Sequence, residues 1–159
     1  MATPDFVLSL RAKIGHDPLW LAGVTAVVLR DGPRGPQVLL VRRADTGDWT
    51  PVTGIVDPGE QPAAAAAREV LEEADVVAEP VRLASVGVTE PVTYANGDRS
   101  QYIDLTFRFR HVSGEPHPAD GENTDARWFD LDDLPPMPPH MRGRVEHALS
   151  DEPAAAFER

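Results

Sequence analysis

Short alternating runs of hydrophobic and polar residues predict a chain built largely from strands. Asn96-Gly97 stands between two such runs and is typical of a tight hairpin turn. The sequence DGPRGP at residues 31–36 separates two further runs and is turn-forming by composition. Pro91 lies inside one run and predicts a break or a bulge there. The expected strands are residues 21–30, 37–43, 81–94, 99–112 and 127–129, and short helices are expected at residues 4–15 and 141–149.

A pattern with helical spacing begins at Pro62. Proline fits the first turn of a helix, and the alanine run from Ala63 to Ala67 favours the helical state. A narrow apolar stripe is expected to pack on the core, and it consists of Ala63, Ala67, Val70 and Ala74. A second face, expected to point away from that stripe, carries Glu69, Glu72 and Glu73.

The clustered glutamates indicate a bound cation. Like charges on one helix face repel, so a chain that keeps them together usually places a cation between them. Hard oxygen ligands suit Mg²⁺ or Mn²⁺. Arg68 precedes Glu72 by four residues and can pair with it, which would fix the direction of a carboxylate. A solvated acidic face would explain the glutamates alone, but it would not explain Gly54, Glu60 and Arg68 at set distances from them.

Composition limits the classes of protein to be considered. The 159 residues suffice for one domain with a core, and 42% of them are hydrophobic. Cysteine is absent, so disulfides, thiolate chemistry and zinc fingers are excluded. The net charge of −11 argues against polymeric nucleic acid as a partner, although a small polyanion can arrive as a magnesium complex. With no long apolar run and no signal-peptide pattern, we expect no membrane partner and a cytoplasmic location.

The stretch from Gly54 to Val76 resembles the Nudix box, G-x5-E-x7-R-E-U-x-E-E-x-G-U, in which U is a bulky aliphatic residue. One position departs from the box, because Asp75 stands where the family has glycine. That glycine is similar to a helix-ending residue with positive φ, which aspartate tolerates, so we expect Asp75 to adopt the left-handed conformation. The matching positions are Gly54, Glu60, Arg68, Glu69, Val70, Glu72, Glu73 and Val76.

The resemblance implies roles for the matching residues. Glu72, Glu73 and the Gly54 carbonyl correspond to direct metal ligands, and Glu69 to either a further ligand or the base that deprotonates water. Glu60 corresponds to a supporting position, through a metal-bound water in one reading. Arg68 is expected to orient a glutamate rather than to contact substrate.

A further catalytic acid comes from a later loop in the family. The Gly/Pro/acid segment at residues 113–125 is the corresponding loop here, and a loop of this length in a compact domain is often functional. Glu122 is the preferred candidate, with Asp120 and Glu115 as alternatives. A merely solvated acidic loop is the competing interpretation.

Several side chains are candidates for substrate contact. Successive strand residues face opposite ways, so one of Arg42 and Arg43 should point into the cleft and meet a phosphate. Trp49, Tyr94 and Tyr102 could stack on a base, although such aromatics more often serve packing. The five histidines are scattered without ligand spacing and receive no role.

The resemblance predicts a hydrolase that cleaves a diphosphate bond in a nucleoside diphosphate linked to another moiety. Pro91 lies 15 residues past the box, similar to ADP-ribose-cleaving relatives, while Tyr94 lies near a tyrosine position of dinucleoside-polyphosphate relatives. The alternatives are a nucleoside triphosphate pyrophosphohydrolase and a catalytically silent nucleotide sensor, the latter disfavoured because every box glutamate is present. Diphosphate isomerisation is disfavoured because the isomerases of this family use a cysteine.

The expected architecture is an α/β (α+β) domain with a central mixed sheet and helices on both faces. The fold of the family that the box resembles is an α/β/α sandwich. Residues 1–150 are expected to form this single domain, and residues 151–159 a flexible C-terminal tail. A homodimer stays among the open alternatives.

Overall fold

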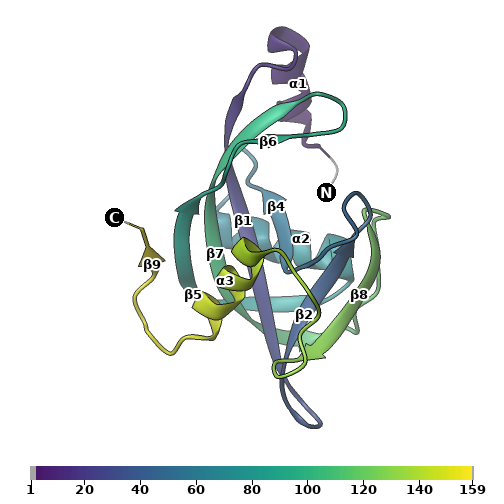
Figure 1. Ribbon diagram of the computed structural model, residues 1–159, viewed down its shortest axis with the longest axis vertical. Helices are drawn as coiled ribbons and strands as arrows, with labels where there is room; N and C mark the ends of the chain where they lie inside the picture. The colour runs from purple at the N-terminus through teal and green to yellow at the C-terminus, as the bar shows by residue number, and fades with distance from the viewer. Residues whose placement is uncertain (1–2, 159) are drawn as a thin grey trace.

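The computed structural model describes residues 3–158, so residues 1, 2 and 159 of the expected domain and tail lie outside the described part. Within this range a mixed β-sheet is flanked by helices on both faces, as expected (Figure 1). No helix in the described range is long and apolar enough to cross a membrane.

The sheet follows the spatial order β3-β2-β1-β7-β5-β9, with β4 paired to β1, β6 to β7 and β8 to β2. The central pair, β1 and β7, runs parallel, and β1 pairs antiparallel with β2 and β4. The strands are β1 (Leu19–Gly32), β2 (Gly35–Arg43), β3 (Trp49–Thr50), β4 (Val52–Ile55), β5 (Val77–Val88), β6 (Val92–Thr93), β7 (Arg99–Ser113), β8 (Asn123–Asp130) and β9 (Ala156–Phe157).

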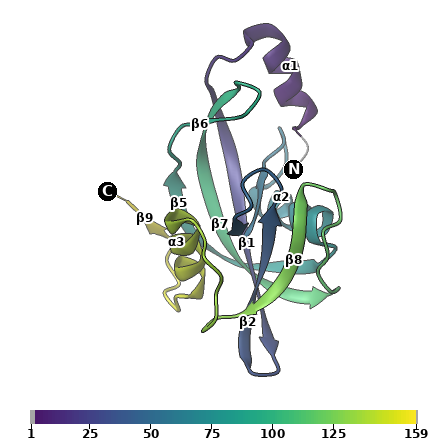
Figure 2. The same ribbon diagram turned by 45° about the vertical axis from the view of Figure 1, so that its right-hand side comes forward.

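Helices cover both faces of the sheet. Helix α2 (Pro62–Ala74) packs on one face against β1, β4 and β5, and α3 (Pro139–Leu149) packs on the other against β1, β5 and β7. Helix α1 (Asp5–Ile14) stands at one end of the molecule beside the β6–β7 hairpin (Figures 1 and 2). This arrangement is the α/β/α sandwich implied by the resemblance.

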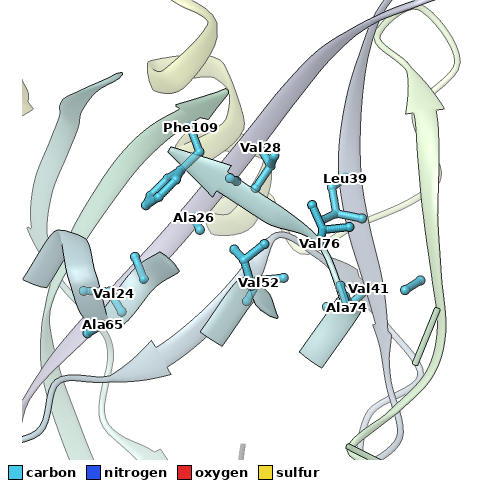
Figure 3. Close-up of a cluster of buried hydrophobic side chains, with 14 residues drawn as sticks. Val24, Ala26, Val28, Leu39, Val41, Val52, Ala65, Ala74, Val76 and Phe109 are labelled. Carbon is cyan, nitrogen blue, oxygen red and sulfur yellow. The ribbon is translucent and has the colours of Figure 1, made fainter. Parts of the chain in front are cut away.

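The alternating direction of side chains along β1 and β2 builds the two core layers. Successive strand residues face opposite ways, so the even-numbered Val24, Ala26 and Val28 pack toward α2 while Val27 packs toward α3. Figure 3 shows the α2-side layer, in which these side chains meet Ala65 and other residues of the helix and the neighbouring strands. Both strands are therefore buried on both faces, which explains their near-continuous hydrophobic sequences.

Local sequence signals are confirmed at several boundaries. Helix α2 begins at Pro62, and the Asn96-Gly97 sequence forms the turn between β6 and β7. Pro91 lies in the expected break, between the end of β5 and the start of β6. Strand β8 begins at Asn123, earlier than expected, which shortens the loop before it. The chain end was expected to be a flexible tail, whereas Ala156–Phe157 pairs in parallel with β5.

Candidate functional site

An acidic cleft of about 460 Å³ opens where α2, the start of α1 and the loop before β8 come together. Its only basic lining residue among those described is Arg68. The remaining lining residues are Thr3, Pro4, Asp5, Asp57, Glu69, Glu72, Asp120 and Glu122. The box residues of α2 therefore meet the acids of the later loop in one cavity.

The glutamates of α2 do not all lie on a solvated face, and the expectation that they point away from the packing stripe was wrong. Glu69 is 2% exposed and Glu73 is 5% exposed, and both lie on the buried side of the helix with Val70 and Ala74. Ala65 and Ala66 are buried there as well, while Ala63 and Ala67 of the expected stripe are only partly buried. Glu72 remains exposed at the cleft.

Gly54 on β4 is a glycine because the side chain of Glu69 occupies the space beside it. A Cβ on Gly54 would lie 2.2 Å from Glu69 Cγ and 2.4 Å from Glu69 Oε1. Burial raises the pKa of Glu69 to about 7, while the neighbouring Arg68 opposes that rise. A carboxyl group in this condition can exchange a proton near neutral pH.

Arg68 connects the glutamates of the cleft. Its guanidinium forms a forked pair with Glu60, with both N···O distances at 2.9 Å. The same group donates to Glu69 at 3.0 Å and to Glu72 at 3.1 Å. The hydrogen bonds from Arg68 hold the pKa of Glu60 below its ordinary value, so Glu60 stays ionised against the arginine. This geometry agrees with an orienting role for Arg68 and a supporting role for Glu60.

The loop before β8 is fastened to the C-terminal end of α2. The backbone N–H of His117 donates to the Ala74 carbonyl at 3.2 Å, and that of Ala119 donates to the Glu73 carbonyl at 3.1 Å. Helix α2 ends at Asp75, whose φ of 54° and ψ of 36° confirm the expected left-handed conformation. The turn at Asp75 leads the chain into β5, and the two backbone hydrogen bonds hold the later loop against the end of the helix that carries the acids.

Three carboxylates converge at this junction. One oxygen from each of Glu73, Asp120 and Glu122 lies within 4.8 Å of the others. Glu73 Oε2 accepts a hydrogen bond of 3.0 Å from Asn123 Nδ2, and burial raises the Glu73 pKa. One buried carboxylate and two more accessible ones gathered in this way fit a hard divalent cation, because the cation offsets their mutual repulsion and favours their ionised forms. The donor set therefore fits Mg²⁺ or Mn²⁺.

Glu115, the third loop acid considered, is placed elsewhere. Its carboxylate pairs with Arg30 at 2.9 Å and is largely exposed, so it lies apart from the converging acids. Arg42 is exposed and donates to the Gly47 carbonyl at 3.2 Å. Arg43 binds the Asp45 carboxylate, which raises the Arg43 pKa, with weaker support from Glu73 and Tyr94. These side-chain hydrogen bonds of both arginines therefore lie in the residue 45–47 loop.

The aromatic candidates are engaged in protein contacts. Trp49 packs edge-on against Phe129 with ring centroids 4.8 Å apart, in the core layer under α3. Tyr94 and Tyr102 join their hydroxyl groups at 2.6 Å, and burial raises the Tyr94 pKa. None of Trp49, Tyr94, Tyr102, Arg42 and Arg43 is among the described residues that line the acidic cleft.

Sequence reasoning missed three contributors to the site. Asn123 supports Glu73 from the first position of β8, and Asp57 and Asp5 line the cleft. Asn123 adjoins Glu122 in the sequence, and Asp57 lies within the box, so both offered a weak signal. Asp5 offered none, because only the three-dimensional packing of α1 brings it to the cleft.

Comparison with known proteins agrees with this geometry. The sequence profile of the NUDIX domain matches residues 20–148. The chain is 36% identical over 107 residues to the NAD-capped RNA hydrolase NudC of Pseudomonas syringae pv. syringae (strain B728a), a match covering 66% of this chain and 36% of that protein. It therefore spans about a third of the length of that relative. It is also 32% identical over 117 residues to a MutT-like protein of Streptomyces ambofaciens, covering 74% of this chain and 68% of that one.

Solved structures repeat the fold. The crystal structure of an ADP-ribose pyrophosphatase from Streptococcus suis 89-1591 superposes with a TM-score of 0.65 at 21% sequence identity. The match covers 87% of this chain and 98% of that one. At this level of identity the likeness concerns the fold alone.

Proposed function

The chain belongs to the Nudix hydrolase family, and we propose that it is a metal-dependent hydrolase that cleaves the diphosphate bond of a nucleoside diphosphate linked to another moiety. The observation that carries this proposal is the convergence of Glu73, Asp120 and Glu122 beside the buried Glu69. Every glutamate of the box is present, which disfavours a catalytically silent sensor: Glu69 and Glu72 line the cleft, Glu73 meets the loop acids and Glu60 pairs with Arg68.

Metal ligation is assigned to the box positions that match the family's ligands and to the loop acids that converge on Glu73. Glu72, Glu73 and the Gly54 carbonyl are the proposed ligands, completed from the loop by Asp120 or Glu122. Glu60 is held by Arg68 in a forked ion pair, so it supports the site without ligating. When bound, Mg²⁺ or Mn²⁺ would neutralise the diphosphate and acidify a water molecule.

Glu69 is the proposed general base. Its carboxyl group is fixed between Gly54 and Arg68, and burial raises its pKa to about 7, which suits proton transfer near neutral pH. In the reaction a water oxygen forms a new bond to one phosphorus and its proton passes to Glu69. The bridging P–O bond breaks, and its electron pair leaves with the second phosphate. Glu122 is the alternative base, and it lines the same cleft.

The names of relatives support the substrate class. One is an NAD-capped RNA hydrolase and another an ADP-ribose pyrophosphatase, and both names point to a diphosphate with a nucleoside on one side. The net charge of −11 favours a small substrate over a polymer. ADP-ribose or a similar molecule is therefore the first substrate to test, and a nucleoside triphosphate is the second.

The test is a phosphate-release screen with chelator-treated protein, with and without added Mg²⁺ or Mn²⁺. The substrates are ADP-ribose, sugar nucleotides, dinucleoside polyphosphates and nucleoside triphosphates, with a phosphatase added to reveal monophosphate products of the diphosphate-linked substrates and a pyrophosphatase added instead for the triphosphates. We expect turnover of a diphosphate-linked nucleoside only when metal is present. Full turnover without any divalent ion would overturn the mechanism, and preference for triphosphates would move the assignment to the second class.

A further inference from the structure

The start of α1 forms a wall of the catalytic cleft. Thr3, Pro4 and Asp5 line the same cavity as Glu69 and Glu72, although more than fifty residues separate the two groups in the sequence. The wall comes from a segment outside the stretch 20–148 that matches the NUDIX domain profile. Its contribution to the site therefore lies outside the part of the chain that the domain profile describes.

Apolar contact fixes α1 next to the strand that carries Gly54. Val7 is 5% exposed and packs in one cluster with Leu21 of β1 and Ile55 of β4. Ile55 directly follows Gly54, and its carbonyl accepts a hydrogen bond of 3.3 Å from Arg68. The first turn of α1 is thus anchored to β4, the short strand on which the box begins at Gly54.

Arg11 fastens the other end of the helix. Its nearly buried guanidinium donates to the Arg99 carbonyl at 2.6 Å and to Ser100 Oγ at 3.1 Å, and it lies 3.5 Å from an Asp98 oxygen. These partners belong to the β6–β7 hairpin, which stands beside α1 in Figures 1 and 2. Because both ends are held, the position of Thr3–Asp5 over the cleft is part of the fold.

The wall adds negative charge where a polyanionic substrate must enter. Six acidic residues and one arginine line the cleft, and Asp5 on α1 is not a member of the group of three converging acids assigned to the metal. Asp5 is exposed, so its carboxylate faces water or a bound ligand. It also stands in the first turn of α1, where it offsets the positive end of the helix dipole, and its removal would leave that end facing the cleft.

We infer that the Thr3–Asp5 wall makes the site selective by charge, with the Asp5 carboxylate favouring diphosphate-linked nucleosides over nucleoside triphosphates. The inference rests on the proposed function and adds a residue that sets its specificity. A triphosphate carries two more negative charges than ADP-ribose at neutral pH, whether or not each binds one Mg²⁺. Repulsion from Asp5 therefore weighs more heavily on the triphosphate.

The test compares Asp5→Asn with the wild type by the ratio of kcat/KM for ADP-ribose to kcat/KM for ATP, in excess Mg²⁺ at low ionic strength. We expect this ratio to fall by about fivefold in Asp5→Asn. The substitution removes one unit charge that repels the two additional charges of ATP across a solvated cleft. Added salt should shrink the difference between the two proteins, because it screens the repulsion. Asp31→Asn is the matched control, since it changes net charge equally at the exposed β1–β2 hairpin, at the opposite end of the molecule from α1 (Figure 1).

An equal ratio in Asp5→Asn and wild type, or an equal shift in Asp31→Asn, would overturn the inference. Calorimetric binding of ADP-ribose and of ATP to the same proteins supplies a readout that does not need turnover. Absence of hydrolysis by the wild type would defeat the proposed function, while the ratio of the two binding constants would still decide the role of Asp5. Thermal unfolding of Asp5→Asn shows whether the variant keeps the stability of the wild type.

Discussion

Gly54 and Glu69 fit together so closely that no side chain can stand on Gly54 while Glu69 keeps its place. A Cβ built there would lie 2.3 Å from Glu69 Cδ, well inside van der Waals contact. The glycine of the box is therefore required by the carboxylate it faces, in addition to any ligation by its carbonyl. Strand β4 and helix α2 therefore approach each other closely where Gly54 faces the Glu69 side chain.

Gly54→Ala should displace the Glu69 carboxylate and with it the proposed base. We expect kcat to fall by about 10²-fold or more, as when an acid–base group is lost, and stability to fall by about 1–3 kcal/mol from overpacking. Gly87→Ala is the control, because Gly87 lies in β5 and a Cβ there would meet no atom within 4 Å. Steady-state kinetics and urea unfolding of both variants measure the two effects. Wild-type kcat in Gly54→Ala would show that the position of Glu69 does not matter.

Glu73→Gln tests the carboxylate shared by α2 and the loop. Sequence reasoning placed Glu73 on the surface, but it is 5% exposed, so its charge has a larger effect on the metal-free fold than expected. Turnover should fall by about 10²–10⁴-fold. Metal-free stability should rise, because the substitution removes a buried charge while its amide oxygen can still accept from Asn123.

The stabilisation by metal gives Glu73→Gln a second measurement. Mg²⁺ should raise the Tm of the wild type by mass action and raise that of the variant much less. Glu79→Gln is the control, since Glu79 is an exposed acid of β5 paired with Arg110. An unchanged metal response in Glu73→Gln would remove Glu73 from the ligand set.

The pH dependence of metal-free stability should report Glu69. Burial raises its pKa from 4.5 to about 7, so folding favours the protonated carboxyl. The resulting stability is present below pH 4.5 and is lost as the pH rises through 7. Glu69→Gln removes this loss. The difference in free energy of unfolding between the variant and the wild type should therefore grow from near zero at acid pH to at most about 3 kcal/mol at pH 8.

Urea unfolding at several pH values, with chelator present, measures this effect. Saturating Mg²⁺ should reverse the loss of wild-type stability at high pH, because a cation favours the ionised carboxylate. A constant difference between Glu69→Gln and wild type from pH 5 to pH 8 would contradict the raised pKa.

Several boundaries of the elements were predictable from the sequence because local chemistry sets them. Pro62 starts α2, Asp75 ends it, and Asn96-Gly97 turns the hairpin, each through the backbone preferences of the residue itself. The apolar runs on either side of the turn-forming residues 31–36 also placed β1 and β2 approximately where the structure has them. The box residues could be recognised because they lie within one continuous segment of the sequence.

What the sequence did not reveal depends on contacts between distant segments. Glu73 is buried because the loop from residue 114 to Asn123 folds back on α2, and no helical periodicity contains that information. Trp49 was a candidate for stacking on a base, but it pairs with Phe129, which lies 80 residues later. Asp5 reaches the cleft only through the packing of Val7 and Arg11. Burial of a polar or aromatic side chain is a property of the assembled fold.

Asp75 is the one departure from the box, and the structure predicts the direction in which its replacement by glycine changes stability. Its φ of 54° lies in the left-handed region, which costs an L-residue about 1–2 kcal/mol, whereas glycine adopts it without a Cβ penalty. Glycine in turn loses about 0.5–1 kcal/mol more backbone entropy on folding. Asp75→Gly should therefore be neutral or stabilising by up to about 1 kcal/mol. The exposed contact of Asp75 with His117, at 3.8 Å, adds little to this balance.

Asp75→Val supplies the opposite case, because a β-branched side chain at positive φ is strained and should destabilise the fold. Both variants should bind Mg²⁺ as the wild type does, since Asp75 lies outside the acidic cleft and its role is to turn the chain. Urea unfolding measures the stability order, and metal titration followed by Tm measures the affinity. A loss of metal affinity in Asp75→Gly would mean that the aspartate side chain has been recruited to the site. Equal stability of the glycine and valine variants would mean that the turn relaxes and that α2 does not depend on the left-handed residue to end.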